Sequence, residues 1–288
     1  MTSSDQDFET FDGLRLHASR REPRDRPLRA GVVVVHGYGE HSGRYAALVD
    51  RLLAAGYGVS QFDLRGHGRS PGPRGYVRAF EDYFDDLGRF MAREREHYAE
   101  RPTFLLGHSM GALIAAHWSC LDAANPARHG VAQFAGLILS GAPLKINERI
   151  HPWLQRLSGP IGFLAPRLPT VRLDERALSR DAAVVEQFQN DPLTFHGRMP
   201  ARTGAEIVRA SKRIGGLIER LTVPVLLMHG TADRLADPEG SRLGCERAAS
   251  TDKTLKLYPG LYHEIFNEPE REQVFADLVT WLAARTGD

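Results

Sequence analysis

The residues best suited to chemistry are Gly107-His108-Ser109-Met110-Gly111, in which a serine lies two positions from a glycine on either side. Residues 103–106 have the pattern of a buried strand, and a helix is predicted to begin at Met110. A sharp strand-to-helix turn would strain the backbone of Ser109 and expose its hydroxyl at the helix N-terminus, where the dipole favours a developing negative charge. We therefore predict that Ser109 is a nucleophile, with a structural glycine-rich turn as the alternative.

A nucleophilic serine needs a general base, and the base needs a carboxylate to orient it. When the serine lies on a turn of this kind, the acid and then the histidine follow it along the chain. Asp233 comes just after a predicted strand, at the sheet edge where catalytic groups gather, and His263 is the only histidine beyond it. The rival acid Asp237 precedes Pro238, a pairing typical of a helix N-cap. We predict a triad of Ser109, Asp233 and His263.

The oxyanion formed during acyl transfer needs two backbone N–H donors. One is expected from Met110, the residue after the nucleophile. The other is expected from the loop after the first parallel strand, at residues 36–40, where Tyr38 is the predicted donor. His36 is predicted to brace that loop and to take no part in proton transfer.

These residues are positioned by an alternation of strands and helices, which predicts a mostly parallel sheet with helices on both faces. An Asp12-Gly13 pair between two short β-prone runs predicts a hairpin before the first parallel strand. The predicted strands span residues 32–35, 58–62, 103–106, 135–139, 223–228 and 254–257, and the predicted helices 44–55, 80–98, 110–121, 238–249 and 269–284.

The alternation stops between residues 143 and 221, which contain no strand-like run. Apolar residues at Ile150, Trp153, Leu154 and Leu157 follow the spacing of an amphipathic helix. Three prolines at positions 160, 166 and 169 are expected to interrupt the stretch after Leu157. We predict a helical cap at 143–221, inserted into an α/β core formed by 1–142 and 222–288.

The composition excludes several classes of protein. Of the 288 residues, 42% are apolar and 25% charged, which is typical of a folded globular chain. The net charge of +1 argues against a nucleic-acid partner. Cys120 and Cys245 are expected to be reduced thiols of a cytoplasmic protein. The polar N-terminus lacks the pattern of a secretory signal, and no apolar run approaches the ~20 residues that span a bilayer.

Several longer stretches resemble the monoacylglycerol lipase and lysophospholipase group of serine α/β-hydrolases. The resemblance runs from about residue 30 to 268 and rests, besides the nucleophile motif, on His36–Tyr45, Asp63–Ser70, Leu178-Ser179-Arg180 and Asn190-Asp191-Pro192-Leu193. It implies the α/β-hydrolase fold, with no cofactor and no metal. Aspartate-nucleophile enzymes of the same fold are excluded by the serine at position 109.

The resemblance also implies a pocket. Glu40 and Arg44 match residues near its glycerol end, although a solvated salt bridge on a loop is an alternative for them. Two positions depart from the pattern: Tyr38 is bulkier than expected, and Phe188 stands where a tyrosine would touch the head group. Ile150, Trp153 and Leu157 are candidates to line an acyl tunnel or to contact a membrane surface, or simply to hold the cap on the core; further members of this set are Leu154, Ile161, Phe163 and Leu164.

The sequence thus predicts a serine carboxylester hydrolase that releases a fatty acid from a monoacylglycerol through an acyl-enzyme. A lysophospholipase or broad carboxylesterase with the same triad is the nearest alternative. A receptor for small molecules with a non-catalytic hydrolase fold is a more remote one. The partner expected in either enzyme is a lipid monoester. The protein is expected to be cytoplasmic, and transient contact of the cap with a membrane surface would make it peripheral to the membrane as well. The sequence does not indicate an oligomeric state.

Overall fold

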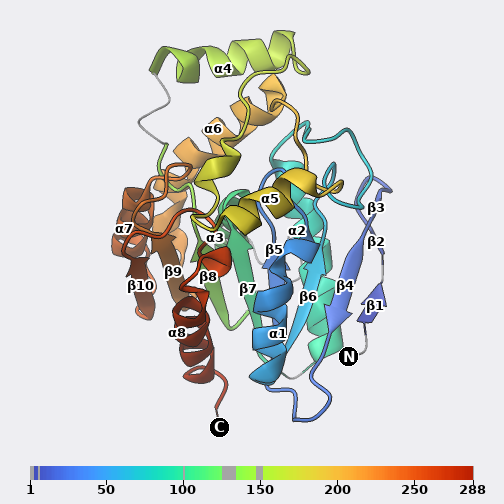
Figure 1. Cartoon of the computed structure of the whole chain (residues 1–288), viewed down its shortest axis with the longest axis vertical. Helices are drawn as coiled ribbons and strands as arrows, with labels where there is room; N and C mark the ends of the chain where they lie inside the picture. Colours follow the sequence, from blue (N-terminus) through green and yellow to red (C-terminus); the bar gives the residue numbers. More distant parts are fainter. Residues whose placement is uncertain (1–2, 6, 100, 125–133, 147–151, 288) are drawn as a thin grey trace.

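The computed structural model describes residues 3–5, 7–99, 101–124, 134–146 and 152–287, with side chains omitted at 3–5, 122–124 and 152–154. Eight strands form one twisted sheet in the order β1-β4-β6-β5-β7-β8-β9-β10 (Figure 1). The strands are β1 (Ser3–Asp5), β4 (Ala18–Arg21), β5 (Ala30–Val35), β6 (Tyr57–Phe62), β7 (Thr103–His108), β8 (Gly136–Ser140), β9 (Val225–Gly230) and β10 (Lys253–Tyr258).

The six strands from β6 to β10 in that order are parallel, which confirms the predicted α/β class. The expected hairpin is also present, as β2 (Phe8–Glu9) and β3 (Arg15–Leu16). The edge strand β1 and its neighbour β4, which pair antiparallel with each other and of which β4 also pairs antiparallel with β6, were not predicted. The sequence of β4, Ala-Ser-Arg-Arg, has little intrinsic strand character, so its extended form depends on pairing with β6.

Helices cover both faces of the sheet (Figure 1). Along β5, Val33 and Val35 belong to the core beneath α2 (Glu81–Tyr98) and α3 (Met110–Ala124). Val32 and Val34 belong to the core beneath α1 (Ala46–Ala54) and α8 (Arg271–Ala283). Burial on both faces explains why β5 is apolar throughout.

The described residues between β8 and β9, which we call the cap, lie over the carboxyl ends of the parallel strands (Figure 1). The cap contains α4 (Pro152–Leu164), the short 3₁₀ turn η2 (Glu175–Ala177), α5 (Ala182–Asn190), α6 (Ala201–Leu217) and the 3₁₀ turn η3 (Ile218–Arg220). After β9, α7 (Pro238–Arg247) packs against β9 and β10.

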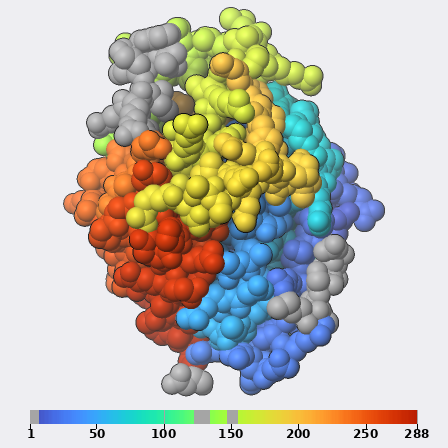
Figure 2. Space-filling model, viewed as in Figure 1, coloured from blue at the N-terminus to red at the C-terminus, as the bar shows by residue number. Residues whose placement is uncertain are grey.

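The outermost element of the cap is α4, which packs against α6 (Figures 1 and 2). The prediction that Pro160 interrupts this segment is wrong, because α4 continues through it to Leu164. A proline at position 160 leaves the carbonyl of Arg156 without its helical partner, and Arg156 is an exposed residue on the outer side of the molecule. Pro166 and Pro169 lie beyond the end of the helix, as expected.

Candidate active site

Ser109 occupies the turn between β7 and α3 with a φ of +53°, a value rare for any residue other than glycine. Its backbone N–H donates to the Ser140 carbonyl at 2.9 Å, which ties the turn to the end of β8. The flanking glycines are required by close approach. A Cβ on Gly107 would lie 2.4 Å from the Gly111 carbonyl oxygen, and one on Gly111 would lie 2.2 Å from that of Val35. The strained turn predicted from the sequence is therefore present.

Asp233 and His263 meet at the same edge of the sheet, on the loops after β9 and β10. His263 Nδ1 donates to Asp233 Oδ2 at 2.6 Å, and both side chains are buried. The other carboxylate oxygen, Oδ1, accepts the backbone N–H groups of Leu235 at 2.8 Å and Ala236 at 3.0 Å. The two loops are also joined directly by a hydrogen bond from the Ala232 N–H to the Leu261 carbonyl. The acid is thus fixed before any substrate arrives.

The pKa values of this pair shift in opposite directions. Burial alone would raise the pKa of Asp233, but the facing His263 and the hydrogen bonds to the carboxylate outweigh it and hold that pKa well below its ordinary range. Burial alone would lower the pKa of His263, but the Asp233 carboxylate overcomes it and raises that pKa above its ordinary 6.5. The carboxylate stays ionised and favours the imidazolium, which is what a triad acid does.

His263 lies beside the nucleophile turn. Its ring centre is 4.8 Å from that of His108, the residue before Ser109. Among the described residues, the hydrogen bonds of the His263 ring do not include one to Ser109 Oγ. In unliganded enzymes such bonds are often long and tighten only when substrate binds.

One histidine close to the pair is not singled out by the sequence, which gives it no more than a surface or structural role. His229, at the end of β9 and 0% exposed, donates from Nε2 to Asp233 Oδ2 at 3.0 Å. Its Nδ1 accepts the Ser241 hydroxyl at 2.7 Å, which fixes the tautomer. The carboxylate of Asp233 therefore accepts four hydrogen bonds. In the sequence, this contact is indicated by the position of His229, which lies four residues before Asp233 at the same strand-to-loop junction.

The loop expected to supply an oxyanion donor lies against Ser109. A Cβ on Gly37, next to Tyr38, would come within 3.0 Å of Ser109 Cβ. The Tyr38 side chain points elsewhere: its hydroxyl donates to the Gly75 carbonyl at 3.3 Å, and its ring packs edge-on against Phe195. The large Tyr38 side chain thus links this loop to Gly75 and Phe195.

His36 braces the same loop, as predicted. Its Nε2 accepts the Leu64 N–H at 2.9 Å, so Nδ1 carries the proton and donates to the Gly37 carbonyl at 2.7 Å. Complete burial lowers the pKa of His36 to about 4, which keeps the ring neutral. A neutral ring held by two backbone groups is a structural element.

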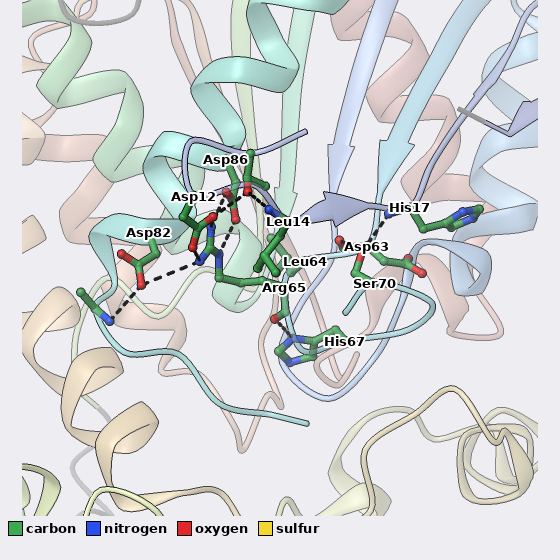
Figure 3. Close-up of polar contacts among 12 residues, drawn as sticks. Asp12, Leu14, His17, Asp63, Leu64, Arg65, His67, Ser70, Asp82 and Asp86 are labelled. Atoms are coloured by element: carbon green, nitrogen blue, oxygen red, sulfur yellow. Dashed lines mark hydrogen bonds and ion pairs between the residues drawn. The ribbon is translucent and has the colours of Figure 1, made fainter. Parts of the chain in front are cut away.

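The Asp63–Ser70 stretch forms a second supporting loop (Figure 3). Asp63 Oδ1 accepts the Ser42 N–H at 2.8 Å, and Oδ2 accepts the Arg69 N–H at 2.8 Å. Arg65 is held in a fork by Asp86, with bonds of 2.6 and 2.7 Å, and also bonds Asp12 of the hairpin at 2.9 Å. This motif anchors the loops around Ser109 and contacts no triad residue among the described contacts.

The polar residues implied by the resemblance cluster near His263. Arg44 Nη2 donates to Glu264 Oε2 at 2.8 Å, and its guanidinium lies 4.7 Å from the centre of the Phe188 ring. Arg44 Nη1 is buried and has no hydrogen-bond partner among the described residues. Glu40 Oε1 accepts the Gly37 N–H at 2.6 Å and the Tyr45 hydroxyl at 2.8 Å. Burial and the nearby Glu40 raise the pKa of Glu264 against the opposing charge of Arg44.

The structure describes the apolar candidates for substrate binding less fully than the polar ones. Phe188 is almost completely buried against Arg44. Leu157 lies on α4 with 44% of its surface exposed. Ile150 lies outside the described residues, and so does the side chain of Trp153. A cavity of about 520 Å³ lies between α4, α6 and α7 and is lined by none of the triad residues, so it does not mark the site that the side-chain geometry defines.

Among the described residues, no group of histidine, cysteine, aspartate and glutamate side chains has the arrangement of a metal site. None of the described helices combines the length and the apolar character needed to cross a bilayer.

Comparison with known proteins agrees with this geometry. A family model described as serine aminopeptidase, S33, matches residues 26–270. A monoacylglycerol lipase of Mycolicibacterium smegmatis is 36% identical over 283 residues, which cover 98% of this chain and 98% of that protein. Phospholipase YtpA of Bacillus subtilis is 34% identical over 253 residues, which cover 87% of this chain and 93% of that protein.

Among solved structures, a soluble variant of monoglyceride lipase from Saccharomyces cerevisiae, in complex with a substrate analog, superposes with a TM-score of 0.87 at 27% identity. The superposition covers 100% of this chain and 97% of that one. The match of the family model extends over the core strands, the cap and all three residues of the predicted triad. The chain therefore belongs to this family of serine hydrolases and has the α/β-hydrolase fold.

Proposed function

We propose that the protein is a carboxylic ester hydrolase acting on monoacylglycerols, with Ser109 as nucleophile, His263 as general base and Asp233 as orienting acid. The observation that carries the proposal is the buried Asp233–His263 hydrogen bond beside a serine held at a φ of +53°. A receptor without catalytic activity would need neither the strained serine nor the ionised acid.

The reaction follows from these positions. His263 Nε2 takes the Ser109 proton as Oγ attacks the ester carbonyl carbon, and the negative charge passes to the carbonyl oxygen. The backbone N–H groups of Tyr38 and Met110 stabilise that oxygen. The imidazolium then protonates the leaving glycerol oxygen, which leaves an acyl-enzyme. Water, deprotonated by His263, attacks the acyl carbon, and the bond to Ser109 Oγ breaks as His263 returns the proton to that oxygen and the fatty acid leaves.

The monoacylglycerol assignment is supported by the named relatives and by the polar cluster. Arg44 Nη1 lacks a partner in its buried position and would bond a glycerol hydroxyl. Glu40 and Glu264 place two carboxyl groups around the single guanidinium of Arg44, so the cluster has no excess positive charge for a phosphate. An uncharged head group fits this balance better than an anionic one. A phospholipase activity is the second candidate, because the chain is also similar to phospholipase YtpA.

The cap is proposed to contact the lipid surface from which the substrate comes. Large apolar side chains gather on α4 and on the segment after it. Phe163 is 75% exposed and Leu164 81%, and they are joined by Leu157, Leu168 and Val171. Apolar side chains grouped on one protruding element favour transfer into an apolar medium.

The proposal is tested with purified wild-type protein and the Ser109→Ala variant. We expect hydrolysis of monoolein by the wild type, a loss of kcat of at least ~10³-fold in Ser109→Ala because triad residues act as a unit, and unchanged folding by circular dichroism. A fluorophosphonate should label Ser109 and no other serine, as located by peptide mass spectrometry. Labelling elsewhere, or an active Ser109→Ala variant, would overturn the triad.

A substrate panel separates the two candidate activities. Monoolein, lysophosphatidylcholine and lysophosphatidic acid with the same oleoyl chain are compared at matched detergent concentration. The charge balance at Arg44 predicts the highest kcat/KM for monoolein and the lowest for lysophosphatidic acid. Equal or faster hydrolysis of the lysophospholipids would favour the phospholipase assignment.

A further inference from the structure

The cap segment Leu178-Ser179-Arg180 lies against the loop that carries His263. The Ser179 hydroxyl donates to the Asn267 carbonyl at 3.2 Å. This contact joins residues 88 positions apart, so the segment connects cap and core, while the same hydroxyl also accepts the Asp181 N–H at the start of α5 at 3.0 Å. The mechanism above makes no use of it.

Two hydrogen bonds fix the backbone on either side of His263, one to this segment and one to Glu268, a carboxylate that the segment holds. After it, the Glu264 N–H donates to the Leu178 carbonyl at 2.8 Å. Before it, the Tyr262 N–H donates to Glu268 Oε1 at 2.9 Å. The first partner is a cap residue, and the second is a carboxylate that the cap also holds.

The carboxylate of Glu268 is the centre of this arrangement. Its side chain is 0% exposed. Besides the Tyr262 N–H, its Oε1 accepts the Arg180 N–H at 3.1 Å, and its Oε2 accepts Arg180 Nε at 2.8 Å. Arg180 also bonds Glu270 farther along the loop. The buried charge of Glu268 therefore depends on Arg180, because no other described side-chain cation bonds to it.

We propose that Arg180 is a positioning residue for the catalytic base: by fixing the Glu268 carboxylate it sets the backbone on both sides of His263 and hence the reach of Nε2 to Ser109. The inference rests on the proposed role of His263. Displacements of about an ångström at a reacting group can lower a rate about 100-fold. A partial relaxation of the loop should therefore lower kcat clearly while the Asp233–His263 pair remains formed.

The test is the Arg180→Leu variant, assayed with p-nitrophenyl acetate and with monoolein. We expect kcat to fall about tenfold on both substrates with KM within twofold of wild type, because the base is displaced whatever the acyl chain. Labelling of Ser109 by a fluorophosphonate should slow by a similar factor. Arg180→Lys, which keeps a cation for Glu268, should recover much of the loss. Arg172→Leu is the matched control, since Arg172 lies in the same cap, is largely exposed and pairs with Glu175 at 3.7 Å.

A loss confined to monoolein, or seen mainly in KM, would show that Arg180 acts through the cap's contact with substrate and would overturn the proposal. If Arg180→Leu does not fold, Glu268→Gln supplies the same test, and wild-type kcat on the acetate ester would overturn it equally. The His263→Ala variant distinguishes a failure of the proposed triad from a failure of the positioning role of Arg180. Activity in His263→Ala would refute the triad, whereas an inactive His263→Ala beside a fully active Arg180→Leu would refute the positioning role alone.

Discussion

Two parts of the cap, on either side of its segment at residues 172–174, meet the rest of the molecule in different ways. The inner part, Glu175–Phe195, is bound to the core by directed polar contacts. His41 Nε2 donates to Asp191 at 2.9 Å, the Phe195 N–H donates to the Gly39 carbonyl at 2.8 Å, and Arg180 bonds Glu268. The outer part, Pro152–Val171, packs on α6 and carries the exposed Phe163 and Leu164. One part is fixed to the loops of the site, and the other faces outward.

This difference indicates that the cap, a single insertion, can both fix the loops of the site and contact an apolar surface. Directed hydrogen bonds fix geometry, so the inner part is suited to hold the loops of Tyr38 and His263. Apolar contacts depend on buried area and little on direction, so the outer part is suited to a fluid surface. Substitutions in the two parts should therefore affect different measurements.

Of the substitutions that distinguish the two parts, those in the outer part should have the largest effect, and the effect should be on binding to lipid vesicles. In the double variant Phe163→Asp/Leu164→Asp, two apolar side chains that would each contribute ~1.5–3 kcal/mol on full burial are replaced by charges. Affinity for neutral phospholipid vesicles, measured by sedimentation, should fall at least ~10-fold, and monoolein hydrolysis on those vesicles should fall with it.

Hydrolysis of soluble p-nitrophenyl acetate by the same double variant is the control and should stay within twofold of wild type. A loss of equal size on the acetate ester would mean that the outer part is as closely coupled to the site as the inner part. The distinction between the two parts would then be wrong.

A smaller effect is expected in the inner part from Asp191→Ala. The variant loses the bond from His41 and the one from the Leu193 N–H, at a cost of ~1–3 kcal/mol in the free energy of unfolding. Because His41 directly follows the loop at residues 36–40 that we propose supplies the oxyanion donor, kcat should fall roughly fivefold on acetate and oleate esters alike.

Asp181→Ala is the matched control, because Asp181 caps the other end of α5 by accepting the Ala183 N–H and bonds no core side chain among the described contacts. It should lose ~0.5–2 kcal/mol of stability with kcat unchanged. If Asp181→Ala lowered kcat as much as Asp191→Ala, loss of stability would explain both results.

The smallest expected difference concerns pH. In its proposed role His263 acts as a base only when neutral, and Asp233 raises its pKa above 6.5. As pH falls through that raised value, kcat/KM for the acetate ester should drop about tenfold per unit. The acid limb of the profile of kcat/KM against pH should therefore lie above pH 6.5. It should coincide in the wild type and in the Phe163→Asp/Leu164→Asp variant. A limb below about pH 6 would show that Asp233 does not raise the pKa of His263.

Much of the core and the site could be predicted because their signals are local. Strand-helix alternation defines the sheet, and a serine between glycines at a strand end defines the turn of Ser109. Asp233 and His263 follow from chain order and from their places after strands. The structure brings the last two together, as expected.

The rest depends on contacts that no local pattern encodes. His41 and Asp191 are 150 residues apart, and each is a common surface residue type. Leu178–Arg180 is recognisable in the sequence only as a matching stretch, and its docking on the His263 loop appears only in three dimensions. The β4 strand is polar and short, and His229 looks like an ordinary strand-end histidine until Asp233 folds back onto it.

The backbone of Ser109 has an evolutionary consequence. A left-handed residue other than glycine costs about 1–2 kcal/mol, and glycine would occupy the same turn without that cost. Drift under selection for folding alone would therefore tend to replace this serine, since marginal stability rewards such changes. A chain that keeps a serine at position 109 keeps a small loss in its free energy of unfolding. Replacement of this serine by glycine would relieve the strain of the positive φ, although glycine loses more backbone freedom on folding.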